Sequence, residues 1–244
     1  MKNTMLIARR EFRAYLTSPM AYIVACVFLV LYGALFVWYF NNTDYSDTSI
    51  NGYLGYWGWV NPGNLILMMF AAALAMRLIA EEKKLGTWEL LLTAPLRDTE
   101  IVMGKFLGSL GMLVSMLALT LYFPLLLWIF GNPDGGPIIT GYLGLFLLGA
   151  ASLSIGLFAS SVTSNQIVAA VIAGGILAVL YFIGSAGGSI SGAVGDILSY
   201  ISLSSHFPAF MAGIIDTQAI VYYLSVTALF LFLTVRSVEA GRWS

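Results

Sequence analysis

Charged residues are scarce in this sequence. Only 9% of the 244 residues are Asp, Glu, Lys or Arg, whereas soluble domains carry about 25%. Hydrophobic residues make up 59%, and the mean hydropathy is +0.89. Several apolar runs approach or exceed the roughly 20 residues that a helix needs to cross a bilayer. The composition excludes an ordinary soluble domain and predicts a polytopic membrane protein.

Residues that carry catalytic or metal chemistry are also nearly absent. Cys26 is the one cysteine and His206 the one histidine, so neither an internal disulfide nor a metal cluster is expected. His206 is interpreted mainly as an interfacial polar residue. The sequence has no G-x-x-x-x-G-K-[ST] motif to cradle nucleotide phosphates. We therefore expect no enzymatic activity and no cofactor on this chain, and no nucleic-acid partner.

Titratable residues are missing from the interiors of the apolar runs as well. Proton relays and ion-coupling sites usually use carboxylates or histidines inside the membrane. A proton-coupled secondary carrier is therefore disfavoured. Sodium coupling through backbone and hydroxyl oxygens stays open as an alternative.

The basic residues are confined to three clusters, and the positive-inside rule places all three in the cytoplasm. An even number of spans must separate successive clusters, and six spans satisfy this. We therefore expect a protein of the cytoplasmic (inner) membrane with both its N- and C-termini in the cytoplasm. The clusters are Lys2, Arg9, Arg10 and Arg13; Arg77, Lys83, Lys84, Arg97 and Lys105; and Arg236 and Arg242.

The predicted fold is an all-α integral membrane protein that forms one domain over residues 1–244. It comprises an interfacial helix before the spans, a short cytoplasmic helix between spans two and three, and short re-entrant helices between spans five and six. The expected ranges are 2–17 for the interfacial helix, 20–40, 62–80, 101–130, 138–160, 166–185 and 219–236 for the spans, 81–96 for the cytoplasmic segment and 186–218 for the re-entrant helices.

Two local patterns refine this fold. Met5, Ala8, Phe12 and Tyr15 recur at helical spacing, which predicts an amphipathic helix lying on the anionic inner leaflet. The run 101–130 is too long for an upright span, and Pro124 offers a place to kink it. The same run contains GKFLG at 104–108, a small-xxx-small pattern that permits close helix approach.

The stretch EEKKLGTWELLLTAPL, residues 81–96, is sharply punctuated. Gly86 is expected to break the helix and Thr87 to N-cap a second short one, with Glu89 in its first turn. Asp98 is expected to cap the third span, and Lys105 to lie near the headgroups. Trp88 and the leucines give more apolar surface than a free loop needs. From the residues alone, this helix either rests on lipid or docks in a socket on a cytoplasmic partner.

Residues 81–105, E-E-K-K-L-G-T-W-E-L-L-L-T-A-P-L-R-D-T-E-I-V-M-G-K, resemble the signature of permease subunits of type-2 ABC exporters. In that family the pattern marks a coupling helix after the second span. SSVTSNQIVAA (160–170) resembles the second cytoplasmic turn of the family, and residues 204–243 resemble the gliding-motility and copper-maturation branch. Trp88 departs from the Leu or Ile common at its position, which bears on partner fit.

The resemblance implies a permease that pairs with a second permease subunit, identical or paralogous, and docks a cytoplasmic ABC ATPase that carries ATP and Mg. A periplasmic or envelope partner is also possible, alongside the lipid bilayer. The implied ATPase contacts are Glu81, Glu82, Lys83, Lys84, Gly86, Thr87, Trp88, Glu89, Leu92 and Pro95, with a secondary set of Ser161, Thr163, Asn165 and Gln166. The implied external gate residues are Ile197, Tyr200, His206, Phe207 and Pro208.

Some alternatives stay open from the sequence. The same ATPase coupling could serve a mechanical transmitter or scaffold of an envelope machine that moves no molecule across the membrane. The substrate, the direction of transport, the branch of the family and the choice between homodimer and heterodimer are not readable from the residues.

Overall fold

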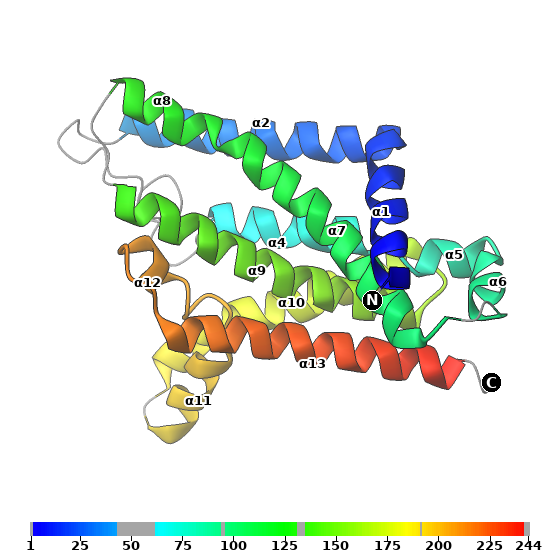
Figure 1. The fold of residues 1–244 in the computed structure, drawn as a ribbon. Coiled ribbons are helices and arrows are strands. Elements are labelled where there is room, and N and C mark those ends of the chain that lie inside the picture. Colours follow the sequence, from blue (N-terminus) through cyan, green and yellow to red (C-terminus); the bar gives the residue numbers. More distant parts are fainter. Residues whose placement is uncertain (1, 43–61, 94–95, 131–134, 191, 242–244) are drawn as a thin grey trace.

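The computed structural model describes residues 2–42, 62–93, 96–130, 135–190 and 192–241 (Figure 1), and all regular secondary structure in these ranges is helical. Within these ranges, six helical stretches are long and apolar enough to span a membrane, which agrees with the expected number. The helices are α1 (Lys2–Thr17), α2 (Pro19–Asn42), α4 (Pro62–Ala75), α5 (Ala80–Lys84), α6 (Thr87–Thr93), α7 (Asp98–Thr120), α8 (Tyr122–Phe130), α9 (Gly135–Val162), α10 (Gln166–Ser189), α11 (Ala193–Ile201), α12 (Pro208–Met211) and α13 (Thr217–Gly241).

The span helices run side by side, and the short helices lie at their two ends (Figure 1). We call the end that carries α1, α5, α6 and the C-terminal end of α13 the basic end. The opposite end carries α11 and α12. The beginning of α1 and the end of α13 both lie at the basic end (Figure 1).

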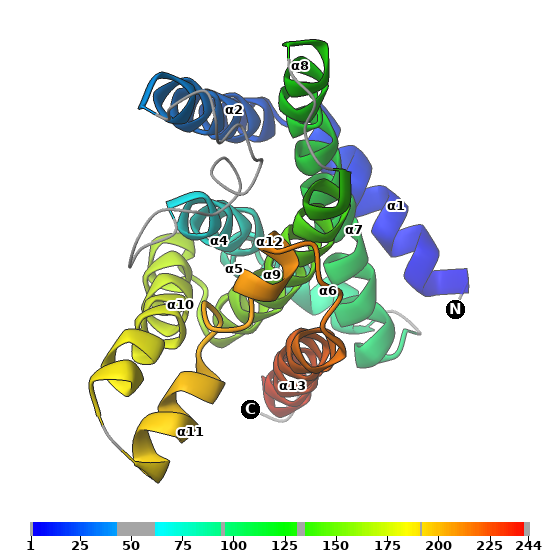
Figure 2. The same ribbon diagram turned by 90° about the vertical axis from the view of Figure 1, so that its left-hand side faces the viewer.

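Helix α9 forms the centre of the bundle (Figure 2). In its most apolar window 83% of the residues are buried, against 17% in the first span and 22% in α10. Small residues make this burial possible: a Cβ on Gly149 would lie 2.7 Å from the side chain of Leu113, and one on Gly156 would lie 2.6 Å from Cβ of Ala75. The outer spans leave apolar faces uncovered, as lipid-facing helices do.

The third span bends where α7 gives way to α8. Pro124 cannot donate a hydrogen bond to the carbonyl of Thr120, and its ring crowds that carbonyl. At the junction of the two helices, the N–H of Leu121 bonds the carbonyl of Ala118, three residues before it, at 3.2 Å. The expected kink therefore lies one turn before the proline that causes it.

Helix α1 runs across the ends of the spans (Figure 1) and packs closely on α7. A Cβ on Gly104 would lie 2.6 Å from Cβ of Ile7, and one on Gly108 would lie 2.6 Å from Cβ of Glu11. The GKFLG pattern thus serves the contact with α1. Of the apolar residues expected to face the membrane surface, Met5 is 67% exposed, whereas Ala8 and Tyr15 are buried against the protein.

Helix α11 folds back alongside the C-terminal part of α10 at the opposite end. The N–H of Leu203 bonds the carbonyl of Leu180 at 3.0 Å, and the hydroxyl of Ser202 bonds the carbonyl of Tyr181 at 3.1 Å. Helix α10 continues to Ser189, beyond the expected end at 185. The 186–218 segment therefore contains the end of α10, the nine-residue α11 and the single turn of α12.

Candidate functional site

The segment between the second and third spans contains two short helices joined by a glycine turn. The second span is interrupted by a turn over 76–79, after which α5 begins. Gly86 has φ +72°, a conformation that costs glycine little, and it separates α5 from α6 as expected. Thr87 is not an N-cap: its hydroxyl donates to the carbonyl of Glu82 at 3.4 Å from within the first turn of α6.

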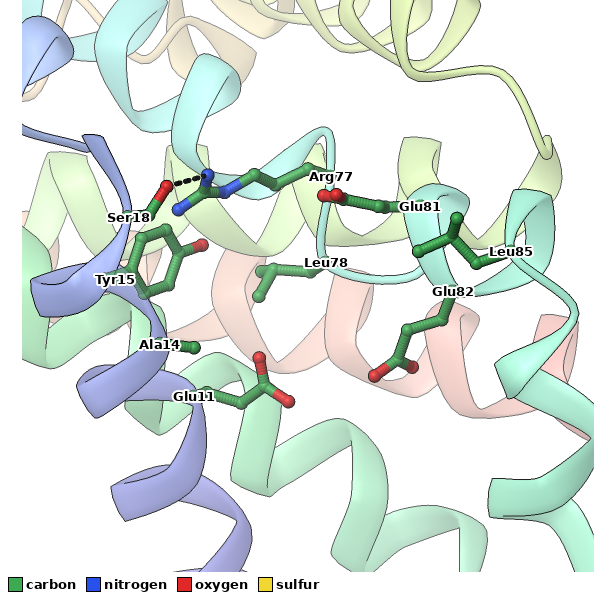
Figure 3. Close-up of a pocket in the computed structure, with 9 residues that line it drawn as sticks. All are labelled: Glu11, Ala14, Tyr15, Ser18, Arg77, Leu78, Glu81, Glu82 and Leu85. Carbon is green, nitrogen blue, oxygen red and sulfur yellow. Dashed lines mark hydrogen bonds between the residues drawn. The ribbon is translucent and has the colours of Figure 1, made fainter. Parts of the chain in front are cut away.

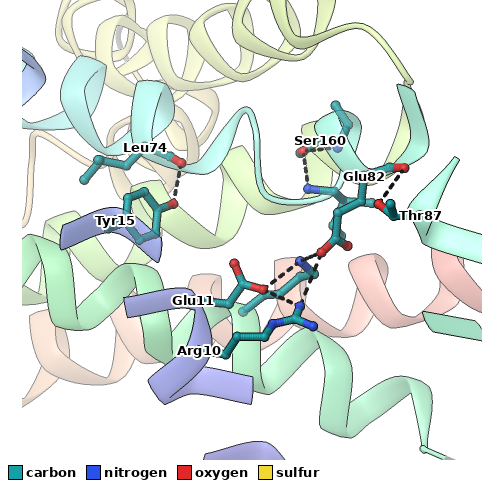
Figure 4. A network of polar contacts seen from close by, with 10 residues as sticks. Arg10, Glu11, Tyr15, Leu74, Glu82, Thr87 and Ser160 are labelled. Carbon is teal, nitrogen blue, oxygen red and sulfur yellow. Dashed lines mark hydrogen bonds and ion pairs between the residues drawn. The ribbon is translucent and has the colours of Figure 1, made fainter. Parts of the chain in front are cut away.

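The break in the second span is stabilised by Ser160, a residue that the sequence did not single out. Its hydroxyl oxygen accepts hydrogen bonds from the N–H groups of Ile79 (3.0 Å) and Ala80 (2.9 Å), and the hydroxyl donates to the carbonyl of Met76 (2.8 Å; Figure 4 shows the Ser160 contacts). Lys83 also donates to the carbonyl of Ser161. The end of α9 therefore holds α5 in place.

Ser160→Ala is expected to lower the free energy of unfolding by about 1–3 kcal/mol, because two buried N–H groups lose their acceptor. Ser185→Ala is the matched control, since the exposed Ser185 hydroxyl only donates to a carbonyl of its own helix. Unfolding in mixed micelles measures both variants. Equal stability of the two variants would contradict the role of Ser160.

Four charged side chains meet where α1, α5 and α7 converge (Figure 4), and we call Arg10, Glu11, Glu82 and Lys105 the charge network. Nζ of Lys105 lies 2.8 Å from Oε1 of Glu82 and 3.2 Å from Oε1 of Glu11. Nη2 of Arg10 lies 2.8 Å from the same Glu11 oxygen and 3.4 Å from the same Glu82 oxygen. Lys105 was expected near the headgroups, but its side chain is only 1% exposed.

The charges of the network sustain one another. Burial favours the neutral form of Glu11 and by itself would raise its pKa. The positive charges and hydrogen bonds of Lys105 and Arg10 outweigh this effect, so the pKa of Glu11 is lowered. The hydrogen bond with Glu11 raises the pKa of Arg10 despite partial burial. Two carboxylates and two cations thus balance, so removal of one leaves a charge uncompensated.

The start of the third span also differs from expectation. Helix α7 begins at Asp98, and Arg97 occupies the capping position. The carboxylate of Glu100 accepts hydrogen bonds from the Arg97 N–H and from the side chain of Asn3, both at 3.3 Å. Glu100 therefore ties the beginning of α7 to the beginning of α1.

The predicted ATPase-contact residues divide by exposure. Trp88 is only 6% exposed, so most of the apolar surface expected from it is used inside the chain. Glu81, Glu82 and Lys83 are half-buried. Leu85, which the sequence did not single out, is 67% exposed. The side chain of Leu92 and all of Pro95 lie outside the described residues. The exposed members are Lys84, Gly86, Thr87 and Glu89.

The secondary set lies at the same end but is not uniformly accessible. Ser161 is buried, and its hydroxyl donates to the carbonyl of Phe158 at 2.7 Å. Asn165 is exposed and caps α10, because its Oδ1 accepts the N–H of Ile167 at 2.9 Å. Thr163 and Gln166 are half-buried. Of these four residues, Asn165 alone is exposed.

The residues assigned to an external gate lie at the opposite end. Ile197 and Tyr200 of α11 are 59% and 52% exposed, and Pro208 is exposed, whereas Phe207 is buried. The ring of His206 stacks on Tyr222 of α13, with ring centres 3.9 Å apart and planes at 4°. The gate set thus combines an exposed α11 face with a packed junction to α13.

The fold and these contacts define a multi-pass helical membrane protein whose membrane spans are joined to a short helical segment at the basic end. The family described as "ABC-2 family transporter protein" matches residues 5–238. The chain belongs to this family, as the resemblance of residues 81–105 indicated, and is a membrane permease subunit of the ABC-transporter class.

A curated relative is the "Probable multidrug ABC transporter permease YbhS" of Escherichia coli (strain K12), which is 34% identical over 116 residues. The protein of the same name from Escherichia coli O157:H7 gives the same values. The alignment covers 45% of this chain and 28% of the relative. The chain therefore matches much less than two thirds of the relative's length. The gliding-motility and copper-maturation branch stays a prediction.

Proposed function

We propose that this chain forms the pathway of an ATP-driven exporter together with a second permease subunit, identical or paralogous. A separate cytoplasmic ATPase subunit, which binds ATP and Mg, docks on α5–α6. The basic end then faces the cytoplasm, in keeping with its clustered Lys and Arg residues. The substrate is a component of the cell envelope or is delivered to it.

The observation that carries this proposal is the burial of Lys105 between Glu82 of α5 and Glu11 of α1. A displacement of α5 should move α1 and α7 with it, because separating these helices would leave the buried charge of Lys105 without its partners. Lys84, Leu85 and Glu89 are exposed at the tip of the same segment. The segment thus has an accessible face for a partner and a buried link to two helices.

Purification from the native host in mild detergent, with a photo-reactive amino acid at position 89, tests the proposal. We expect a stoichiometric P-loop subunit that crosslinks to position 89. The matched control places the same amino acid at position 200, which is exposed at the opposite end, and should give no such crosslink. Recovery of the chain without any P-loop subunit, even after irradiation, would overturn the assignment of α5–α6.

A further inference from the structure

A pocket of about 310 Å³ lies at the basic end between α1 and α5. Glu11, Ala14 and Tyr15 of α1 form one wall, and Glu81, Glu82 and Leu85 form the other (Figure 3). Arg77 and Leu78, in the turn that interrupts the second span, close the space between these walls. The pocket adjoins the exposed tip of α5–α6, so a partner that contacts this tip can reach it.

The pocket contains carboxylate oxygens that the chain itself leaves unused. Oε2 of Glu82 is buried and has no hydrogen-bond partner among the described residues. Within the same part of the chain, the carboxylate of Glu81 makes neither an ion pair nor a hydrogen bond, and only its backbone groups are bonded. Arg77 is directed elsewhere: it donates to the hydroxyl of Ser18 at 3.3 Å, and its guanidinium lies 4.5 Å from the centre of the Tyr15 ring. A buried carboxylate oxygen without a donor is costly, so a donor that enters the pocket would stabilise Glu82.

The rest of the lining determines what kind of donor fits. Ala14, Leu78 and Leu85 give the pocket an apolar side, which suits the aliphatic stem of a long basic side chain. Glu81 and Glu82 are separate acceptors, and a guanidinium can donate to both because its N–H groups point in several fixed directions. The described carboxylates do not group into a metal site.

We propose that this pocket receives an arginine side chain of the cytoplasmic ATPase subunit. The inference rests on the proposed function and adds a second attachment point to the exposed face of α5–α6. Charge complementarity favours the arginine. Arg10 and Lys105 pair with Glu11 and Glu82, whereas the carboxylate of Glu81 makes no ion pair among the described residues, and Arg77, the cation of the pocket lining, donates to Ser18 instead. An arginine held there contacts both walls of the pocket and therefore links α1 to α5.

Crosslinking at two positions of α1 tests the occupant. A photo-reactive amino acid at Ala14, which lines the pocket, should capture a peptide of the P-loop subunit that contains an arginine. The same amino acid at Met5, which is exposed on α1 away from the pocket lining, should not. Crosslinking from position 89 but not from position 14 would overturn the pocket assignment and leave the proposed function standing. Failure at both positions would overturn both.

Affinity provides the second measurement. The full-length chain in nanodiscs is titrated with the P-loop subunit that co-purifies with it. Glu81→Gln keeps the shape of the side chain but removes its charge, and should weaken binding roughly tenfold. Asp196→Asn, the same change at an exposed residue of the opposite end, should leave binding unaltered. Unaltered binding in both variants would contradict a bound arginine.

Discussion

Lys105→Met is expected to lower the free energy of unfolding by about 3–5 kcal/mol, among the largest effects of any single change in this chain. Methionine fills similar space but leaves the half-buried carboxylates of Glu11 and Glu82 without the buried cation that lies 3.2 Å and 2.8 Å from them. Helix α1 should then separate from α5. Unfolding in mixed micelles measures the loss, and limited proteolysis reports the release of α1.

Two further variants make the Lys105 result specific. Lys84→Met applies the same substitution to an exposed lysine of α5 and should change stability by less than about 0.5 kcal/mol. Removing both carboxylates as well, in Lys105→Met/Glu11→Gln/Glu82→Gln, should recover most of the lost stability, because no uncompensated buried charge remains. If Lys105→Met were no more damaging than Lys84→Met, the charge network would not hold the three helices together.

Gly195→Ala is expected to open the hairpin of α10 and α11. A Cβ at this position would lie 1.9 Å from the carbonyl oxygen of Ile190 and 2.7 Å from that of Gly187. Both contacts are with backbone atoms, which cannot rotate away as a side chain can. We expect a local cost of about 3 kcal/mol or more, at the upper end of overpacking effects. Hydrogen exchange of the amides of residues 193–201 should accelerate accordingly.

The neighbouring Gly188 provides the control for this change. It lies in the same hairpin, but a Cβ there would meet nothing within 4 Å. Gly188→Ala should therefore leave exchange in α11 unaltered and slightly favour the helical state. Unchanged exchange in Gly195→Ala would mean that α11 is not held against α10 at close range.

The spans and the turn at Gly86 could be predicted because their causes are local. Long apolar runs specify the spans, and the positive φ of Gly86 suits the one residue without a Cβ. Pro124 likewise indicated the bend in the third span. These features depend on residues within a turn or two of the structure they produce.

The central contacts of the candidate site could not be predicted in this way because their partners are distant in sequence. The turn over 76–79 contains no proline or glycine, and it is satisfied by Ser160, about 80 residues further on. The burial of Lys105 depends on α1 crossing the end of α7, which no periodicity specifies. Trp88 and Leu85 are both apolar, so their residue types do not tell which of them is buried. Only tertiary packing decides that Trp88 is buried and Leu85 is exposed.

Paired spin labels test most directly whether the charge network transmits motion from the ATPase to the spans. Cys26 is exposed and is first replaced by serine. In the complex with the P-loop subunit, we expect ATP binding to change the distance between labels at Thr99 of α7 and Ala240 of α13, and to leave the distance between Arg13 of α1 and Thr99 constant. In the stable Lys105→Met/Glu11→Gln/Glu82→Gln variant the first change should disappear. An undiminished change in that variant would contradict transmission through the charge network.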